Sequence, residues 1–361
     1  MAQSLKDMMY VNPSVATNYL KYALGAGLVP FIEGSPGIGK SQIVKQVAKE
    51  AGLKVIDLRL SMCDVTDLMG LPRFSKKGDK DIAEFAPFNI FPTDKDSVPK
   101  GYNGFLLFLD EFNSASEEVQ AASYKLILDR QVGMYSLHPD CYVVCAGNGK
   151  SDRAITHEMS TAMVSRLVHI RMKTDIKCWM ENVALPRKYD PRIIAYLNMQ
   201  PDSLMDFKPE NDETRDKTFC CPRSWEFVDK LLKTDMEVSL ATQPLLAGVI
   251  SEGEAVKFTQ FCLLNNKITK YEDILSNPTN AMVPGDTSSR WLVISSIAQQ
   301  FNPEKTTELE KIHIYMNRFG DKSMYVLCIR MLKTRYDLSN QPFFHTILSD
   351  LADYMLEDNN E

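Results

Sequence analysis

The chain has 361 residues, with 41 Lys and Arg against 47 Asp and Glu, which gives a formal net charge of −6. This acidic balance lacks the electrostatic footprint of a nucleic-acid binder, and no apolar run reaches the roughly 18 residues of a membrane span. The N-terminal segment lacks the basic and apolar regions of a secretory signal. Eight cysteines without a C-x-x-C pair, and only five histidines, disfavour a zinc site or a disulfide framework and favour a reducing cytoplasm.

The first 172 residues alternate short apolar runs with helical patterns. The apolar runs predict strands at residues 29–32, 53–60, 105–109, 141–146 and 167–172. Amphipathic periodicity predicts helices at residues 41–50 and 114–129, and two hairpins are predicted at residues 72–87 and 130–139. This alternation indicates an α/β fold with a mostly parallel sheet covered on both sides. The uninterrupted apolar run at 105–109 predicts a strand buried on both faces.

Strand signals fade after residue 172. Helices are predicted at residues 176–185, 191–199, 224–233 and 243–264, and further helical pattern covers 290–355. A polar loop at 208–218 separates two of these helices. Residues 277–289, rich in Pro, Gly, Asn and Ser, are the best candidate linker, and the acidic tail at 357–361 is expected to be frayed.

One motif between a predicted strand and a predicted helix matches the phosphate-loop pattern G-x-x-x-x-G-K-[ST]. Its residues are Gly34, Ser35, Pro36, Gly37, Ile38, Gly39, Lys40 and Ser41. In such a loop, backbone N–H groups and the helix N-terminus face phosphate oxygens. Lys40 is predicted to reach the β- and γ-phosphates, and the Ser41 hydroxyl is predicted to bind Mg²⁺. A chance glycine turn before a helix is the alternative, which the strand–helix context disfavours.

Polar residues end two of the other predicted strands. Asp110 and Glu111 follow the run at 105–109, at the strand edge where ligands bind in parallel sheets. Asp110 is predicted to hold Mg²⁺ directly or through water, and Glu111 to polarise an attacking water. Asn148, after the run at 141–146, could orient that water and contact the γ-phosphate. Solvated acids and an ordinary turn asparagine are the alternatives.

Several arginines could contact phosphate. Arg166 precedes the last predicted strand and could serve as an arginine finger on a neighbour's nucleotide. Arg153 and Arg171 are rival candidates, and a surface cation at a helix end is the alternative for Arg166. Arg223 lies at a helix N-terminus, where the helix dipole mildly disfavours a cation, so a nearby anion would relieve the misfit. Its alternative is a solvent-facing arginine beside a core Trp225.

Taken in this order, these motifs resemble those of an AAA+ ATPase. They resemble the Walker A loop (34–41), the Walker B strand (106–111), sensor 1 (Asn148), the arginine finger (Arg166) and sensor 2 (Arg223). Four stretches resemble the MoxR-like branch in particular: D-L-x-G-x-P at 67–72, D-E-x-N at 110–113, the hairpin at 130–139 and the sensor 2 signature at 222–226. The resemblance covers about residues 10–265. It departs at Leu167, where MoxR-like chains typically have Phe after the finger arginine.

The resemblance implies a P-loop αβα core at residues 1–172, an α-helical lid at 173–265 and, beyond the family core, an accessory helical region at 266–361. It also implies Mg²⁺-dependent ATP hydrolysis in a hexameric ring. Glu111 would activate water, Asn148 would position it, Arg166 would reach in from the next subunit, and Arg223 would report lid closure. Family members often act as chaperones beside a von Willebrand factor A domain protein, so a protein client is expected, with neither a membrane nor nucleic acid as partner.

Two other functions remain open from the sequence. One is a nucleotide-gated assembly factor without catalysis, against which the second acid, Glu111, argues. The other is a GTP-dependent motor on nucleic acid like the McrB branch, against which the net acidity argues. Lys76, Lys77 and Lys80 in the first hairpin could meet an acidic client, although a solvated turn is the simpler interpretation.

Overall fold

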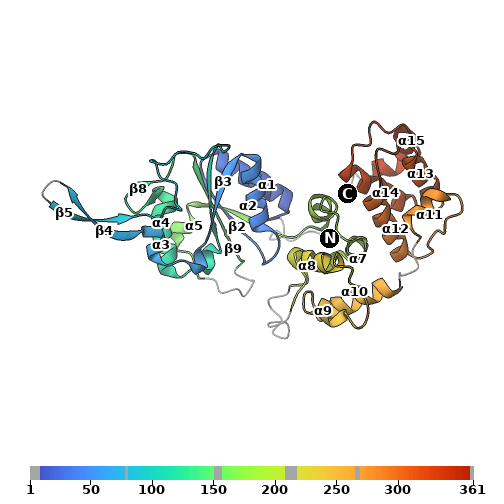
Figure 1. Ribbon diagram of the computed structural model, residues 1–361, viewed down its shortest axis with the longest axis horizontal. Coiled ribbons are helices and arrows are strands. Elements are labelled where there is room, and N and C mark those ends of the chain that lie inside the picture. The colour runs from blue at the N-terminus through green and yellow to red at the C-terminus, as the bar shows by residue number, and fades with distance from the viewer. Residues whose placement is uncertain (1–8, 78–79, 150–156, 208–217, 265–268, 358–361) are drawn as a thin grey trace. The chain divides into compact units, whose positions relative to one another are not determined.

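The protein is described by a computed structural model that covers residues 9–77, 80–149, 157–207, 218–264 and 269–357 (Figure 1). The chain divides into two compact units, with the boundary between Thr174 and Asp175. The first unit contains the sheet and the second is helical, and each is described by itself. Among the described residues, no helix is both long enough and apolar enough to cross a membrane.

The first unit is built on a six-stranded sheet in which all neighbouring strands are parallel. In spatial order the strands are β1 (Tyr10–Val11), β10 (Leu167–Met172), β2 (Val29–Glu33), β9 (Cys141–Gly147), β6 (Gly104–Asp110) and β3 (Leu53–Arg59). The five strands predicted from apolar runs are all present, within one residue at either end. The two-residue edge strand β1 was not predicted.

Helices cover both faces of this sheet. The helices of the unit are α1 (Pro13–Gly25), α2 (Lys40–Glu50), α3 (Val65–Met69), α4 (Glu117–Leu128) and α5 (Thr161–Val164). Because side chains alternate along a strand, Leu107 and Leu109 of β6 join the core beneath α3 and α4, while Leu106 and Phe108 point to the face that α1 and α2 cover. All four side chains are fully buried, so the prediction of a strand buried on both faces is confirmed. The result is a three-layer αβα fold, as predicted.

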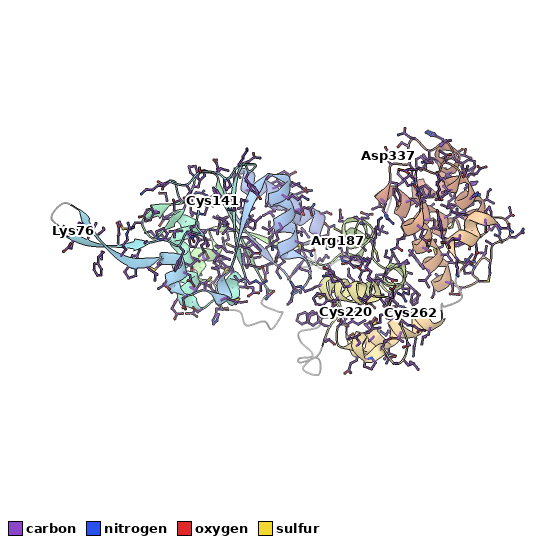
Figure 2. All side chains as sticks on the ribbon, in the orientation of Figure 1. Lys76, Cys141, Arg187, Cys220, Cys262 and Asp337 are labelled. Carbon is purple, nitrogen blue, oxygen red and sulfur yellow. The ribbon has the colours of Figure 1, made fainter. Side chains whose placement is uncertain are left out.

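Two hairpins interrupt the αβ alternation, close to where the sequence predicts them. β4 (Leu71–Lys77) pairs with β5 (Lys80–Ala86), and β7 (Gln131–Val132) pairs with β8 (Tyr135–Ser136), both antiparallel. The β4–β5 hairpin extends away from the body of the unit, and Lys76 lies near its end (Figure 2). The side chains of Lys77 and Lys80 lie outside the described residues.

In the part that the structure describes, the second unit contains helices, turns and loops. Its helices are α6 (Ile176–Trp179), α7 (Pro191–Met199), α8 (Pro222–Leu232), α9 (Gln243–Ala247), α10 (Glu252–Leu264), α11 (Tyr271–Ser276), α12 (Thr287–Gln300), α13 (Glu308–Asn317), α14 (Lys322–Arg335) and α15 (Phe344–Glu357). One continuous hydrophobic core runs from Trp179 to Leu351. In this core α12 packs against both α7 and α14.

Three predictions about this unit were wrong in detail. The helix predicted at 243–264 is two helices, because Gly248 ends α9 and the Ser251 hydroxyl turns to Asp206, at 2.5 Å, before α10 begins. The helix predicted at 176–185 passes from α6 into a π-helical turn, Met180–Ala184. Residues 277–289 do not join two units. They form the connection from α11 into the start of α12, and Tyr315 and Thr269 both donate hydrogen bonds to the Met282 carbonyl within it.

Other predictions fall partly outside the described residues. The polar loop predicted at 208–218 is described only at Thr218, and the tail only at Glu357. Helices α1 and α3 were not predicted, although α3 lies in the D-L-x-G-x-P stretch. The helix predicted at 114–129 begins later, at Glu117, because Ser116 caps it.

Candidate functional site

The loop from residue 34 to residue 39 leaves the buried strand β2 and enters α2. Gly37 and Gly39 have φ angles of 79° and 102°, in the left-handed region that favours glycine. At Gly34 a Cβ atom would come within 2.7 Å of the Met172 carbonyl oxygen on β10. The glycines of the motif therefore meet real backbone requirements, and the loop has the curled form that a phosphate-binding loop needs. Ser35 and Pro36 are half-buried in it, and Ile38 is buried.

Lys40 is the most enclosed charged residue of the site, with 9% of its surface exposed. Its ammonium group donates hydrogen bonds to the Gly34 carbonyl, to the Ser35 carbonyl at 3.0 Å and to Asn148 Oδ1 at 3.1 Å. A buried ammonium needs such acceptors because it loses hydration. The same bonds hold the amine at the loop, between the ends of β2 and β9.

Ser41 and Asp110 are brought together from different elements. The Ser41 hydroxyl, in the first turn of α2, donates a 2.8 Å hydrogen bond to Asp110 Oδ2 at the end of β6. Mg²⁺ usually takes one or two protein oxygens and completes its octahedron with phosphates and waters. Neighbouring ligands of that octahedron lie about 2.9 Å apart, so these two oxygens suit it. In the described part of the chain, no group of three or more His, Cys, Asp and Glu side chains is placed to hold a metal alone.

Glu111 follows Asp110 in an unusual backbone conformation. Its φ angle of 55° lies in the left-handed region, which a non-glycine residue enters only at a cost of about 1–3 kcal/mol. The turn is stabilised by the Glu111 N–H, which donates to Asp110 Oδ1 at 2.9 Å. Its half-exposed carboxylate accepts a hydrogen bond from the Ser61 hydroxyl, just after β3. The turn therefore directs Asp110 and Glu111 to different partners, although they are adjacent in sequence.

Asn113 joins the Glu111 turn to the end of β9. It is 5% exposed, donates from Nδ2 to the Asn148 carbonyl at 2.7 Å and accepts from the Asn148 N–H at 3.1 Å. Gly147 makes room for it, since a Cβ atom there would lie 2.2 Å from Asn113 Oδ1. Sequence reasoning noted Asn113 only as part of the D-E-x-N resemblance and missed Ser61, for which no sequence signal exists. Both contacts depend on residues distant in the chain.

The three arginines proposed as finger residues have different surroundings. Arg166 is exposed directly after α5, and its guanidinium donates to the Ala162 carbonyl at 2.9 Å. Arg171 lies in β10 beside Glu33 of β2, with 3.5 Å between the charged groups. Arg153 lies outside the described residues. The exposed guanidinium of Arg166 is free of any carboxylate within ion-pair distance among the described residues.

Arg223 belongs to the second unit. It is exposed in the first turn of α8, which begins with Pro222 and is fixed by a hydrogen bond from the Cys221 N–H to Ser224 Oγ at 2.8 Å. The neighbouring Trp225 is fully buried, and its indole N–H donates to the Ser203 carbonyl at 2.8 Å. Trp225 therefore anchors α8 in the core and leaves Arg223 at the surface. The structure brings Lys40, Ser41, Asp110, Glu111 and Asn148 together, and it does not place Arg223 relative to them.

The cysteines take no part in this site. All eight are free thiols, and all except Cys63 are buried. Burial raises the pKa of Cys141 to about 11 and also raises the pKa of Cys220 above the usual range of a thiol. The thiols of Cys141 and Cys220 are therefore protonated and unreactive at neutral pH.

A scan against protein-family models finds no matching family. Among solved structures, the chain is similar to a candidate ATPase from Cytophaga hutchinsonii, with 14% identity over 96% of this chain and 90% of that one and a TM-score of 0.35. It is also similar to the RuvB Holliday junction branch migration motor of Thermotoga maritima, with 16% identity over 77% of this chain and 79% of that one and a TM-score of 0.36. TM-scores this low do not by themselves define the fold. The strand order and the loop geometry of the chain define it as a P-loop αβα unit followed by a helical unit.

Proposed function

We propose that this chain is a Mg²⁺-dependent, ATP-hydrolysing AAA+ ATPase of the MoxR-like branch. The observation that carries the proposal is the convergence of Lys40, Ser41, Asp110, Glu111 and Asn148 from the ends of three parallel strands, linked by the Lys40–Asn148 and Ser41–Asp110 hydrogen bonds. Parallel sheets bind ligands at the carboxyl ends of their strands. The arrangement supports triphosphate hydrolysis rather than a chance glycine turn.

The strand order supports the same proposal. β9 lies between β2, which leads into the phosphate loop, and β6, which ends in the two acids. Asn148 at the end of β9 is therefore next to Lys40 on one side and is tied through Asn113 to the Glu111 turn on the other. A γ-phosphate bound at the loop would have Asn148 and Glu111 beside it, where a water can be positioned and polarised.

Each residue then has a chemical role. The backbone of residues 35–39 and the N-terminus of α2 bind phosphate oxygens, and Lys40 neutralises the β- and γ-phosphates. Ser41 and Asp110 would hold Mg²⁺, which would supply positive charge to the transferred phosphoryl group. Glu111 takes the proton of the attacking water, and Asn148 orients that water. Arg223, on the helical lid proposed at residues 173–265, is proposed to report lid closure.

Nucleotide turnover by matched variants tests this assignment. Wild-type protein should hydrolyse ATP with Mg²⁺ and lose turnover when the metal is chelated. Glu111→Gln should bind a fluorescent ATP analogue normally and hydrolyse at least about a hundredfold more slowly, whereas Lys40→Ala should lose binding. Normal hydrolysis by Glu111→Gln overturns the catalytic assignment. Wild-type turnover no higher than that of Lys40→Ala favours a nucleotide-gated assembly factor, and a preference for GTP favours the McrB-like alternative.

A homo-oligomeric ring, hexameric in the resemblance, is part of the proposal. Arg166 is exposed and bonded only to a neutral carbonyl in the described structure, so its charge is available to a neighbouring nucleotide. Mixing tests this directly: Arg166→Ala and Glu111→Gln should each be inactive alone. In rings formed from an equal mixture of the two variants, about a quarter of the interfaces join a subunit with an intact Glu111 to a neighbour with an intact Arg166. ATP hydrolysis should therefore reappear in the mixture. If Arg166→Ala alone still hydrolyses ATP, the same mixing experiment with Arg171→Ala and Glu111→Gln tests Arg171 as the arginine finger.

A protein client, such as a von Willebrand factor A domain protein, is also proposed, in a cytoplasmic setting that suits eight free thiols. The β4–β5 hairpin supports it, because Phe74 on β4 is 84% exposed and Phe85 on β5 is 40% exposed, and a partner that covered them would remove apolar surface from water. Glu111→Gln protein loaded with ATP should retain the client during affinity capture. Phe74→Ser should lose it, with Tyr22→Ser, an exposed aromatic on α1, as the control. Residues 266–361 are proposed to be an accessory helical region, and no separate client is assigned to them.

A further inference from the structure

Asn113 is enclosed in a way that the catalytic roles above leave unexplained. It touches neither Lys40 nor the Ser41–Asp110 pair in the described hydrogen bonds, yet both ends of its amide bond to the backbone of Asn148. A hydrogen-bonded pair of this kind fixes a backbone more firmly than one bond, because it removes rotation about either bond. The conformation of residue 148 is therefore set by a side chain from another strand end.

The surroundings of Asn113 leave it little freedom. It follows the left-handed turn at Glu111 within a short 3₁₀ turn, Phe112–Ser114, and its own carbonyl accepts from the His157 N–H at 2.7 Å. The missing Cβ of Gly147 provides the space for its Oδ1. Neighbouring Phe112 is fully buried against Phe31 of β2, with ring centroids 6.1 Å apart. A residue held this tightly can transmit position from the Glu111 turn to Asn148.

We infer that Asn113 is a positioning residue for the proposed hydrolysis, which holds Asn148 at the γ-phosphate position and in register with Glu111. The inference rests on the proposed function. Asn113 connects the turn at Glu111 to Asn148 at the end of β9, so that the positions of the two side chains are fixed relative to each other. A water held between Glu111 and Asn148 then keeps its line of attack, and an error of about 1 Å in such geometry can cost on the order of a hundredfold in rate.

A double-mutant cycle tests the inference. Asn113→Ala should lower kcat by about tenfold or more, while the Kd for an ATP analogue stays within about threefold, because the phosphate loop is untouched. Asn113→Ala combined with Asn148→Ala should be no slower than Asn148→Ala alone, since the effect passes through Asn148. Independent, multiplying losses in the double variant overturn the inference, as does a normal kcat in Asn113→Ala.

Gln120 provides a matched control. It is also a buried amide, 6% exposed, and it donates to the Ala115 carbonyl at 3.1 Å without contact to Asn148. Gln120→Ala should reduce thermal stability comparably and leave kcat unchanged, so an equal loss of kcat would reduce the role of Asn113 to general stability and overturn the inference.

If Asn113→Ala does not fold, Asn113→Asp keeps the shape and the acceptor for the Asn148 N–H while it removes the donor to the Asn148 carbonyl. The same loss of kcat is expected, and an unchanged kcat overturns the inference.

Measurements on the wild-type protein distinguish failure of the proposed function from failure of this inference. Absence of any Mg²⁺-dependent turnover overturns the proposed function and this inference with it, whereas wild-type turnover with an additive cycle overturns this inference alone.

Discussion

Lys40 Nζ donates a 3.1 Å hydrogen bond to Asn148 Oδ1, although the two residues are 108 positions apart in the chain. The bond joins the first residue of α2 to the residue that follows β9. A neutral amide oxygen suits this position because it accepts from the ammonium group without cancelling its charge. The Asn148 contact therefore does not neutralise the charge that Lys40 would offer to phosphate.

Two replacements of Asn148 should distinguish the orientation of the attacking water from the charge next to Lys40. In Asn148→Ala we expect near-normal binding of ATP and a kcat lower by at least about tenfold, because water is no longer oriented. In Asn148→Asp we expect a further loss of affinity, since the new carboxylate pairs with Lys40 and repels the γ-phosphate. Titration with a fluorescent ATP analogue and steady-state kinetics measure both quantities. Tighter binding by Asn148→Asp than by Asn148→Ala would contradict this view of the Lys40–Asn148 contact.

The Ser41–Asp110 pair should control the requirement for Mg²⁺. Asp110→Asn keeps the shape but removes the negative charge, so the Mg²⁺ concentration for half-maximal hydrolysis should rise about tenfold or more. Ser41→Ala should shift it in the same direction. Asp57→Asn is the control, because Asp57 on β3 is ion-paired with Lys45 of α2 at 2.8 Å, whereas Ser41 donates to Asp110. An unchanged Mg²⁺ requirement in Asp110→Asn would exclude Asp110 as a ligand.

The sequence predicts the central strands of the sheet well because they are buried on both faces. β6 and β9 are continuous or nearly continuous apolar runs, and such runs have few alternative structures. β1 could not be predicted, since it is two residues long and is defined only by pairing with β10, through Tyr10 opposite Arg171. The break between α9 and α10 follows Gly248, but the hydrogen bond from the Ser251 hydroxyl to the distant Asp206 could not be predicted from residues 243–264.

In the candidate site, too, the local motifs could be predicted from the sequence and the contacts between distant residues could not. Lys40, Ser41, Asp110 and Glu111 belong to local motifs whose chemistry follows from residue type and spacing. The interactions that orient them are non-local: Ser61 reaches Glu111 from 50 residues away, and Asn113 reaches Asn148 from 35 residues away. Side-chain pairing at that separation depends on strand order, which periodicity does not determine.

Thiol labelling should distinguish Cys63 from the other cysteines. Seven thiols are buried, and burial is the largest cause that raises the pKa of Cys141 and Cys262, to about 11 and about 12. Cys63 is half-buried, and its pKa is also raised, by burial and then by Asp67 and Asp64. We therefore expect one slow iodoacetamide adduct in native protein, faster at higher pH, and eight in urea, as measured by intact mass. Several rapid native adducts would contradict the packing of both units.

The second unit should lose stability on acidification partly through His313. The imidazole Nδ1 of His313 on α13 is 2.7 Å from the Tyr325 hydroxyl on α14, and its ring packs edge-on against Phe343 with centroids 5.0 Å apart. Burial lowers the pKa of His313, Lys322 lowers it further, and Asp350 and Glu310 partly oppose the shift.

The sign follows from proton uptake. Because the folded pKa of His313 lies below its unfolded value of about 6.5, the unfolded chain takes up the proton first as the pH falls. The stability that neutral His313 contributes is complete above that value and is lost progressively below it. Urea unfolding at pH 8 and pH 5 measures this loss, and tryptophan fluorescence reports it selectively, since Trp179, Trp225 and Trp291 all lie in the second unit. His313→Gln removes the titration, so its midpoint should fall less than that of the wild type between the two pH values. An equal fall in both proteins would assign the loss of stability between pH 8 and pH 5 to other groups of the unit.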